Sequence, residues 1–454
     1  MANCSPQRRP GAVNLARLAF SLTLFSLVLV CALEVAQAAA AQKKKSLPPD
    51  PSALRPPQLK DHFLADRLPE KPTLPPFATI PLDPMDFAEP NPVYLGNRFT
   101  MASLDFLDED HILFTFRVPG LIRRTPGKED DDDEHNIRAV VIAIPSGTIK
   151  AQAIWVLHGR DRYIWPLKGG RFLIRDGQEI SVGDERLRVK PSLSFPGPVL
   201  DLTMDPEEQY LVTSSHEPVA RESKTGASDD GPVDDHSTAP DYVLRVFRRA
   251  SGDVLNVMRV RNVERIPINS QGILEALQGY SNQWKIDLAD FQGGTKHIAQ
   301  VVSQCMPKLE FLSDSEFLAT TCKPEGGFGL IAITTSGQML WQDSTSGYSV
   351  WPILRRTDAG LRFLHETLAA TREIGAYWAL DRTDVKAQRV RAIDAADGNV
   401  VFEATADPVL DAGGNAAISP SGRRVALLSG GKIEIFNLPP PPPLPAAATR
   451  SAAR

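Results

Sequence analysis

Four short stretches of this chain share one pattern: two runs of alternating apolar residues separated by a small polar turn that contains a glycine. They are GLIAITTSGQMLW from residue 329, VVIAIPSGTIKAQAIW from 140, VLRVFRRASGDVLNV from 243 and VRAIDAADGNVVFEA from 390. Alternation gives each run one buried face, and glycine supplies the positive φ that a tight hairpin requires. The pattern therefore indicates recurring antiparallel β-hairpins and not a cofactor-binding motif used four times.

The hairpins belong to a larger unit of four strand-like runs. In the clearest unit, KLEFLSD (308–314) and EFLATTCK (316–323) form a first hairpin, and GLIAITT and QMLWQ form a second. Turn glycines at 252, 294 and 337 lie 42 and 43 residues apart, which is the length of a propeller blade. Six further segments fit the unit, and no long helical period separates the strands. We therefore predict an all-β fold, a seven-bladed β-propeller of four-stranded antiparallel blades.

The last unit, NAAISPSGRRVALLSGGKIEIFNL, contains only three strands. PFATIPL at residues 76–82 is the one strand-like run before the first unit that lacks a partner. Pairing the two would close the ring and shield sheet edges that otherwise pair with other chains. We therefore predict a propeller closed by an N-terminal strand and spanning residues 76–438.

The repeats resemble those of known propeller families. AAISPSGRRVALLSGGKIEIFNL resembles the WD40-like repeats of exported bacterial propellers, and IAITTSGQMLWQ and RAIDAADGNVVFEA look like quinoprotein (PQQ-like) repeats. Such families include quinone-dependent dehydrogenases, lactonase-like hydrolases and binding scaffolds of the bacterial envelope. The resemblance therefore implies the fold and leaves the function open.

The two ends of the chain differ from the repeats. Residues 1–38 have three arginines, an apolar run at 18–35 and a small-x-small site at 36–38, which indicates a secretory signal peptide. Residues 39–75 form a proline-rich extended linker, with a short helix expected at 59–68, and residues 439–454 form a proline- and alanine-rich disordered tail. No second segment is apolar for long enough to span a membrane. We expect a secreted or periplasmic protein, and a monomer.

The charge of the chain argues against nucleic acid as a partner. The formal net charge is −5 over 454 residues, and outside the tail no cluster of Lys and Arg could match a phosphate backbone.

Two cysteines remain after the predicted signal peptide. Cys305 and Cys322 lie nine residues before and eight residues after Asp314, the turn of a predicted hairpin. An antiparallel register about that turn brings them face to face, which in an oxidising compartment predicts a disulfide. The alternatives are two reduced thiols or a register slip that separates them.

Two insertions are rich in acidic residues. KEDDDDEH at 128–135 and EPVARESKTGASDDGPVDDHSTAPD at 217–241 both lie between the second and third strands of a blade, so both are expected on one face. Their carboxylates could bind calcium or recruit a basic partner, and the alternative is a pair of solvated loops. The candidate metal ligands are Asp130, Asp131, Asp132, Asp133, Asp234 and Asp235.

No catalytic motif stands out. The eight histidines show no His-x-x-x-His spacing, and no Gly-x-Ser-x-Gly elbow occurs. Trp155, Trp341 and Trp378 fall at or near strand positions, where aromatic residues pack between blades. We predict no catalytic residue and a non-enzymatic scaffold that binds a protein or glycan partner. The alternative is a quinone-dependent oxidoreductase or lactonase-like hydrolase with a metal at the central channel.

Overall fold

The computed structural model describes residues 60–63, 68–89, 101–118, 134–159, 162–217, 242–260, 266–324, 327–344, 353–357, 360–371, 382–410 and 413–441. All of them belong to one unit of the chain, Leu59–Arg454.

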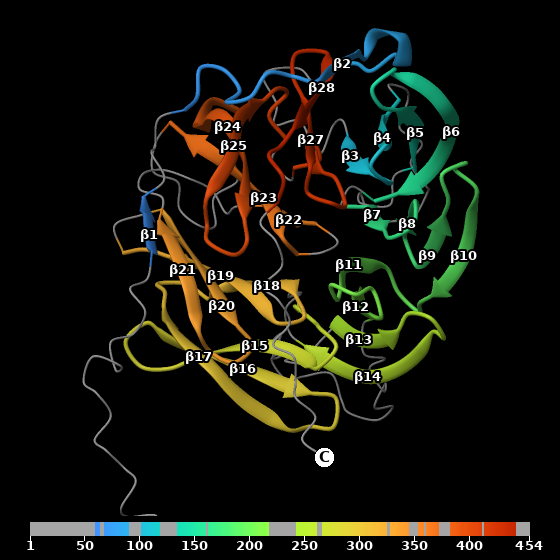
Figure 1. Cartoon of the computed structure of the whole chain (residues 1–454). Helices are drawn as coiled ribbons and strands as arrows, with labels where there is room; N and C mark the ends of the chain where they lie inside the picture. Colours follow the sequence, from blue (N-terminus) through green and yellow to red (C-terminus); the bar gives the residue numbers. More distant parts are fainter. Residues whose placement is uncertain are drawn as a thin grey trace, which may run out of the picture. The chain divides into compact units, whose positions relative to one another are not determined.

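Seven β-sheets surround a common centre (Figure 1). The first three contain β3 (Ser103–Phe106), β4 (His111–Arg117), β5 (Glu134–Ala143) and β6 (Thr148–His158); β7 (Ile164–Leu167), β8 (Arg171–Asp176), β9 (Glu179–Gly183) and β10 (Val189–Ser194); and β11 (Val199–Met204), β12 (Tyr210–His216), β13 (Tyr242–Arg248) and β14 (Asp253–Val260). The next two contain β15 (Gly272–Gln278), β16 (Gln283–Asp290) and β17 (Thr295–Val302); and β18 (Lys308–Ser313), β19 (Glu316–Cys322), β20 (Phe328–Thr334) and β21 (Met339–Ser344). The last two contain β22 (Ile353–Arg356), β23 (Arg362–Ala370), β24 (Val385–Asp394) and β25 (Val400–Ala406); and β26 (Ala416–Ile418), β27 (Arg424–Leu428) and β28 (Lys432–Asn437). The predicted all-β seven-bladed propeller is confirmed, and we number its blades one to seven in this order.

The four hairpins found in the sequence all join the third and fourth strands of a blade. They are β5–β6, β13–β14, β20–β21 and β24–β25, and their turn glycines Gly147, Gly252, Gly337 and Gly398 have φ of 70°, 73°, 93° and 75°. In blade four the positive φ of 91° belongs to Gly293, one residue before the glycine that the spacing singled out. A glycine with positive φ therefore recurs at this turn in blades one, three, four, five and six.

An N-terminal strand closes the ring. β2 (Ala78–Pro81) pairs antiparallel with β28 and completes the sheet of blade seven. Ile80 and Leu82 are buried in the core that blades seven and one share, because alternation along the strand places both on the same face. The predicted closure is confirmed.

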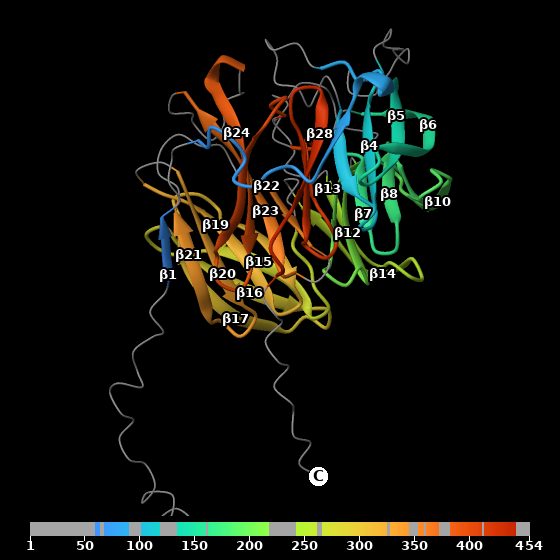
Figure 2. The same ribbon diagram turned by 45° about the horizontal axis from the view of Figure 1, so that its top comes forward.

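The expected helix at 59–68 is wrong where the structure describes that segment. β1 (Lys60–Phe63) is a strand that pairs parallel with β21, and two views show it beside that strand (Figure 1 and Figure 2). A helix this short is marginal in water, whereas the outer edge of blade five offers unpaired backbone groups. Backbone pairing to that edge therefore determines the conformation of this segment, and local helix propensity does not.

Blade four departs from the four-strand pattern. Its expected first strand, RIPINS at 265–270, is reduced to one β-bridge between Ile268 and Ile273. Pro267 lacks a backbone N–H and so interrupts a ladder at this position. The segment still reaches the centre of the ring, where it takes the place of a first strand.

Aromatic side chains fill the spaces between blades, as predicted. Trp341 of blade five is fully buried, stacks on Phe363 of blade six at 6.2 Å between ring centroids, and donates a hydrogen bond to the Ala395 carbonyl. Trp155 of blade one packs against Phe172 of blade two. Trp378 lies outside the described residues.

The helical content of the described residues consists of two 3-10 turns, η1 (Asp83–Met85) and η2 (Arg382–Asp384). No helix in this part of the chain has the length and hydropathy to cross a membrane.

Candidate functional site

The antiparallel strand order assigns every connection to one of two ends of the ring. Connections from a second to a third strand, and from one blade to the next, emerge at the same end, which we call the insertion face. Connections from the first to the second and from the third to the fourth strand emerge at the opposite end. Figure 2 shows the strands running between these ends.

Both acidic insertions leave the ring at the insertion face. One joins β4 to β5 and the other joins β12 to β13, so each connects a second to a third strand. The candidate calcium ligands Asp130, Asp131, Asp132, Asp133, Asp234 and Asp235 lie outside the described residues. Calcium binding by these carboxylates therefore stays a prediction.

The second insertion begins at an anchored carboxylate. Glu217 accepts hydrogen bonds from both terminal nitrogens of Arg245 at 2.5 and 2.7 Å, and its backbone carbonyl accepts one from Arg259. The bonds from Arg245 hold the pKa of the Glu217 carboxyl below its usual range. Because β13 and β14 supply these arginines, the first residue of the insertion is fixed to the sheet.

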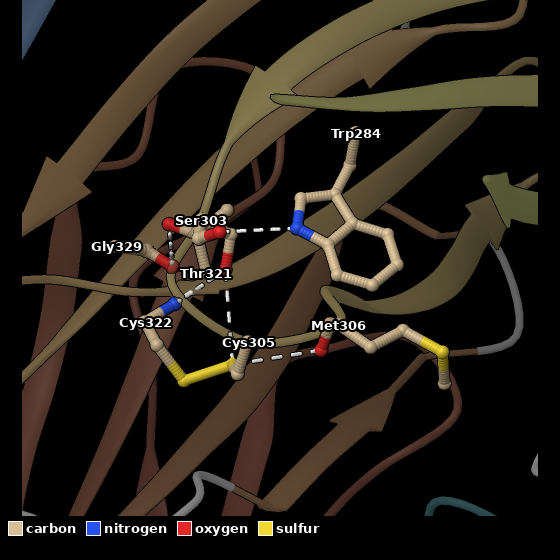
Figure 3. Close-up of a disulfide and its surroundings, with 7 residues drawn as sticks. All are labelled: Trp284, Ser303, Cys305, Met306, Thr321, Cys322 and Gly329. Carbon is tan, nitrogen blue, oxygen red and sulfur yellow. Dashed lines mark hydrogen bonds between the residues drawn. A yellow bond between two sulfur atoms is a disulfide. The ribbon is translucent and has the colours of Figure 1, made fainter. Parts of the chain in front are cut away.

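A disulfide joins Cys305 and Cys322 at the same face (Figure 3). The sulfurs are 2.10 Å apart, and the Cα atoms are 5.6 Å apart. Cys305 lies between blades four and five, and Cys322 ends β19, so the bond ties an inter-blade connection to the second strand of blade five. The pairing is the one that hairpin symmetry about Asp314 predicts.

Hydrogen bonds through Ser303 reinforce this connection (Figure 3). The Cys322 backbone N–H donates to the Ser303 hydroxyl at 2.9 Å, and the Trp284 indole N–H donates to the Ser303 carbonyl at 3.0 Å. The disulfide, the end of β17 and the buried indole of β16 thus form one rigid corner between two blades.

A cavity of about 150 Å³ lies at the centre of the ring. Every blade contributes to its wall, through Asp105, Trp165, Leu202, Ile268, Glu310, Arg355 and Ala417. All but Ile268 belong to the first strand of their blade, which identifies these strands as the innermost ones. The cavity is the second candidate site because it combines charged and apolar groups.

Arg355 holds two carboxylates at this centre. Its Nη1 lies 3.0 Å from Asp105 of blade one, and its Nε lies 3.3 Å from Glu366 of blade six. Both acids are buried, and the Ser103 hydroxyl also donates to Asp105 at 2.6 Å. The two acidic groups are therefore compensated by a shared guanidinium, as buried charges require.

Glu366 also connects to a buried amide network. Gln388 donates to Glu366 at 3.0 Å and to Asn415 of blade seven at 3.1 Å. Burial raises the pKa of Glu366, and Arg355 opposes that rise. Glu366 therefore has a charged partner in Arg355 and a neutral hydrogen-bond donor in Gln388.

The buried histidine of blade six lies on the other face of its strand. Burial, together with the nearby charges of Arg391 and Arg389, lowers the pKa of His365 to about 3. His365 alternates with Glu366 along β23 and is therefore directed away from the carboxylate cluster. Among the described residues, no three His, Cys, Asp or Glu side chains are grouped closely enough to hold a metal ion.

The central cluster escaped sequence reasoning. Asp105, Arg355 and Glu366 each lie in a strand that also contains apolar residues, and they are separated by up to 261 positions. A charged residue inside a buried strand was the available signal, because such a residue must find a partner in the fold.

No protein-family model and no curated protein sequence matches this chain. Solved structures with a similar fold include a chain of the "Crystal Structure of Mitotic Checkpoint Complex", with 11% identity and a TM-score of 0.42, covering 83% of this chain and 99% of that one. Another is a chain of Kuenenia stuttgartiensis hydrazine synthase, with 9% identity and a TM-score of 0.41, covering 70% of this chain and 99% of that one.

Proposed function

We propose that this chain is an exported, non-enzymatic propeller scaffold that binds a basic protein partner through the insertion face. The observation that carries the proposal is that the strand ends flanking both acidic insertions lie at the same end of the ring as the Cys305–Cys322 disulfide. Propellers present their connections as a continuous surface, and connections supported by a rigid scaffold are where binding residues gather.

Charge indicates the class of partner. Residues 218–241 contain six acidic and two basic residues, and residues 119–133 contain five acidic and three basic, so their net charges are −4 and −2. Like charges concentrated on one face attract a basic surface over the Debye length and accelerate its association. A basic protein fits this field better than a glycan, which is the alternative partner.

Export rests on two independent features of the chain. The first is the signal-like segment at 1–38, and the second is the disulfide, since such bonds persist in oxidising compartments. A scaffold is preferred to an enzyme because Arg355 forms an ion pair with Asp105, the buried carboxylate of blade one that lines the central cavity.

The test is a selection of random dodecapeptides displayed on phage against the oxidised full chain. The wild type is expected to enrich Lys- and Arg-rich peptides, with affinities that fall as salt rises. Changing Asp130, Asp131, Asp234 and Asp235 to Asn is expected to weaken those peptides about tenfold, because it removes four charges from the insertion face.

A matched control removes four charges at the opposite end, through Asp110→Asn, Glu185→Gln, Glu207→Gln and Asp253→Asn. These side chains lie in or beside connections between first and second or third and fourth strands. Equal losses in the two variants, or no enrichment of basic peptides by the wild type, would contradict the proposal.

A further inference from the structure

Blade four has a highly exposed tyrosine, Tyr280, on the insertion face. Tyr280 is 92% exposed, more than any other large apolar side chain among the described residues. It lies in the turn between β15 and β16, the second-to-third-strand connection of this blade once the bridge at Ile268 is taken as its first strand. The neighbouring connection of this type, in blade three, is the more acidic insertion.

The turn that presents Tyr280 is tightly held. Its two central residues, Ser281 and Asn282, both have positive φ, at 54° and 60°. The Gln283 N–H donates to the Tyr280 carbonyl at 3.1 Å, and the Gly279 N–H donates to the Gln283 carbonyl at 2.7 Å. A two-residue hairpin turn of this kind matches the twist of its strands. Serine in the left-handed region costs energy that glycine would not, so the turn keeps a strained backbone.

The corner formed by the Cys305–Cys322 disulfide, the end of β17 and Trp284 is hydrogen-bonded to this turn. The Ser303 N–H donates to the Asn282 carbonyl at 2.9 Å, and Ser303 is the residue that contacts both Trp284 and Cys322. The Cys305–Cys322 bond, whose contacts with Ser303 are drawn in Figure 3, is therefore linked through Ser303 to the turn that carries Tyr280. Exposed Val302 and Met306 flank the same corner along the chain. A rigid aromatic on a supported turn lowers the ordering cost of binding.

We propose that Tyr280 is the aromatic anchor of the partner interface and that its occupant is a basic protein segment carrying Arg or Lys. The inference rests on the proposed function and deepens it by naming the contact residue. Tyrosine is enriched among residues that dominate binding energy, and its ring face attracts a guanidinium or ammonium group. Residues 218–241, in the corresponding connection of neighbouring blade three, have a net charge of −4, which favours a basic occupant.

The experiment uses the strongest basic dodecapeptide enriched by the oxidised wild-type chain, synthesised and titrated by calorimetry. Tyr280→Ala is expected to weaken it about tenfold or more, and Tyr280→Phe by less than about threefold, since Phe keeps the ring face. The matched control is Val257→Ala, a 53% exposed side chain on β14. It is expected to leave the affinity unchanged, and thermal melting checks that all variants fold alike.

The Cys305→Ser, Cys322→Ser double variant tests whether the disulfide holds the turn that carries Tyr280. It is expected to weaken the peptide less than Tyr280→Ala does, through slower association or faster dissociation from a looser platform. Unchanged binding by Tyr280→Ala, with the loss on Asp-to-Asn substitution retained, would overturn the anchor and leave the scaffold proposal intact. Failure of the wild type to enrich any basic peptide would overturn both.

Discussion

Gly337 and Gly293 form a natural pair for separating two costs of a hairpin turn. Each lies between the third and fourth strands of its blade, and their φ values are 93° and 91°. They differ in surroundings. A Cβ built at Gly337 would lie 2.4 Å from the Ile298 carbonyl oxygen, whereas a Cβ at Gly293 meets no atom within 4 Å.

The magnitudes follow from these contacts. An alanine in the left-handed region costs about 1–2 kcal/mol, and this cost applies at both positions. At Gly337 the backbone of blade four must also move away from the new methyl group, which adds about 1–3 kcal/mol by analogy with overpacking. We expect Gly293→Ala to lower the free energy of unfolding by about 1–2 kcal/mol and Gly337→Ala by about 2–5 kcal/mol.

Urea unfolding of both variants beside the wild type measures the difference. The smaller entropy of the unfolded chain with alanine affects both variants equally, so it cancels in the comparison. Midpoints lowered equally in the two variants would refute the contact between the β20–β21 turn and β17. Midpoints equal to that of the wild type in both variants would refute the positive φ itself.

Three further predictions test the disulfide, the central cluster and the buried histidine. The Cys305→Ser, Cys322→Ser variant is expected to lose about 3 kcal/mol in unfolding experiments, because the bond closes a loop across 17 positions, and reductant should produce the same loss in the wild type but none in the variant. Arg355→Met is expected to cost about 3–5 kcal/mol at pH 7, since Asp105 and Glu366 stay buried without their cation, and acidification should reduce that difference. His365 has a pKa of about 3 in the fold against an ordinary 6.5, so the unfolded chain binds a proton that the folded chain refuses and stability falls as pH drops from 6.5 towards 3. His365→Gln should flatten that slope in pH-dependent melting, and an unchanged slope would assign it to other groups.

The repeating part of the fold was predictable because its signals are local. Alternation and turn glycines gave each hairpin, and the missing strand of blade seven pointed to PFATIPL. Three errors share a cause. The strand β1, the bridge at Ile268 and the shift from Gly294 to Gly293 each depend on a partner strand or on one backbone N–H. The local sequence pattern specifies neither the partner strand nor the position of a single backbone N–H.

The sites were less predictable than the blades. Sequence symmetry about Asp314 located the disulfide because both cysteines belong to one hairpin and its flanks. The exposure of Tyr280 could not be predicted from its neighbours in the sequence, since a tyrosine next to a glycine also suits a buried strand end. Tyr280 is exposed in the turn between β15 and β16, outside both strands. The central ion cluster depends on which strands share the axis, and only ring closure determines that.

The position of Arg355 shows how closure and the central cluster are connected. Asp105 belongs to blade one and Arg355 to blade six, so their ion pair spans the inner strand of blade seven. That strand, β26, is three residues long and begins with Ala416 and Ala417, and Ala417 lines the same central cavity as Arg355. The blade that needs β2 to complete its outer edge is therefore also bracketed at the axis by a pair of opposite charges on its two neighbours. Blade seven is therefore held at both edges, by the backbone pairing of β2 with β28 at the outside and by the Asp105–Arg355 ion pair at the axis.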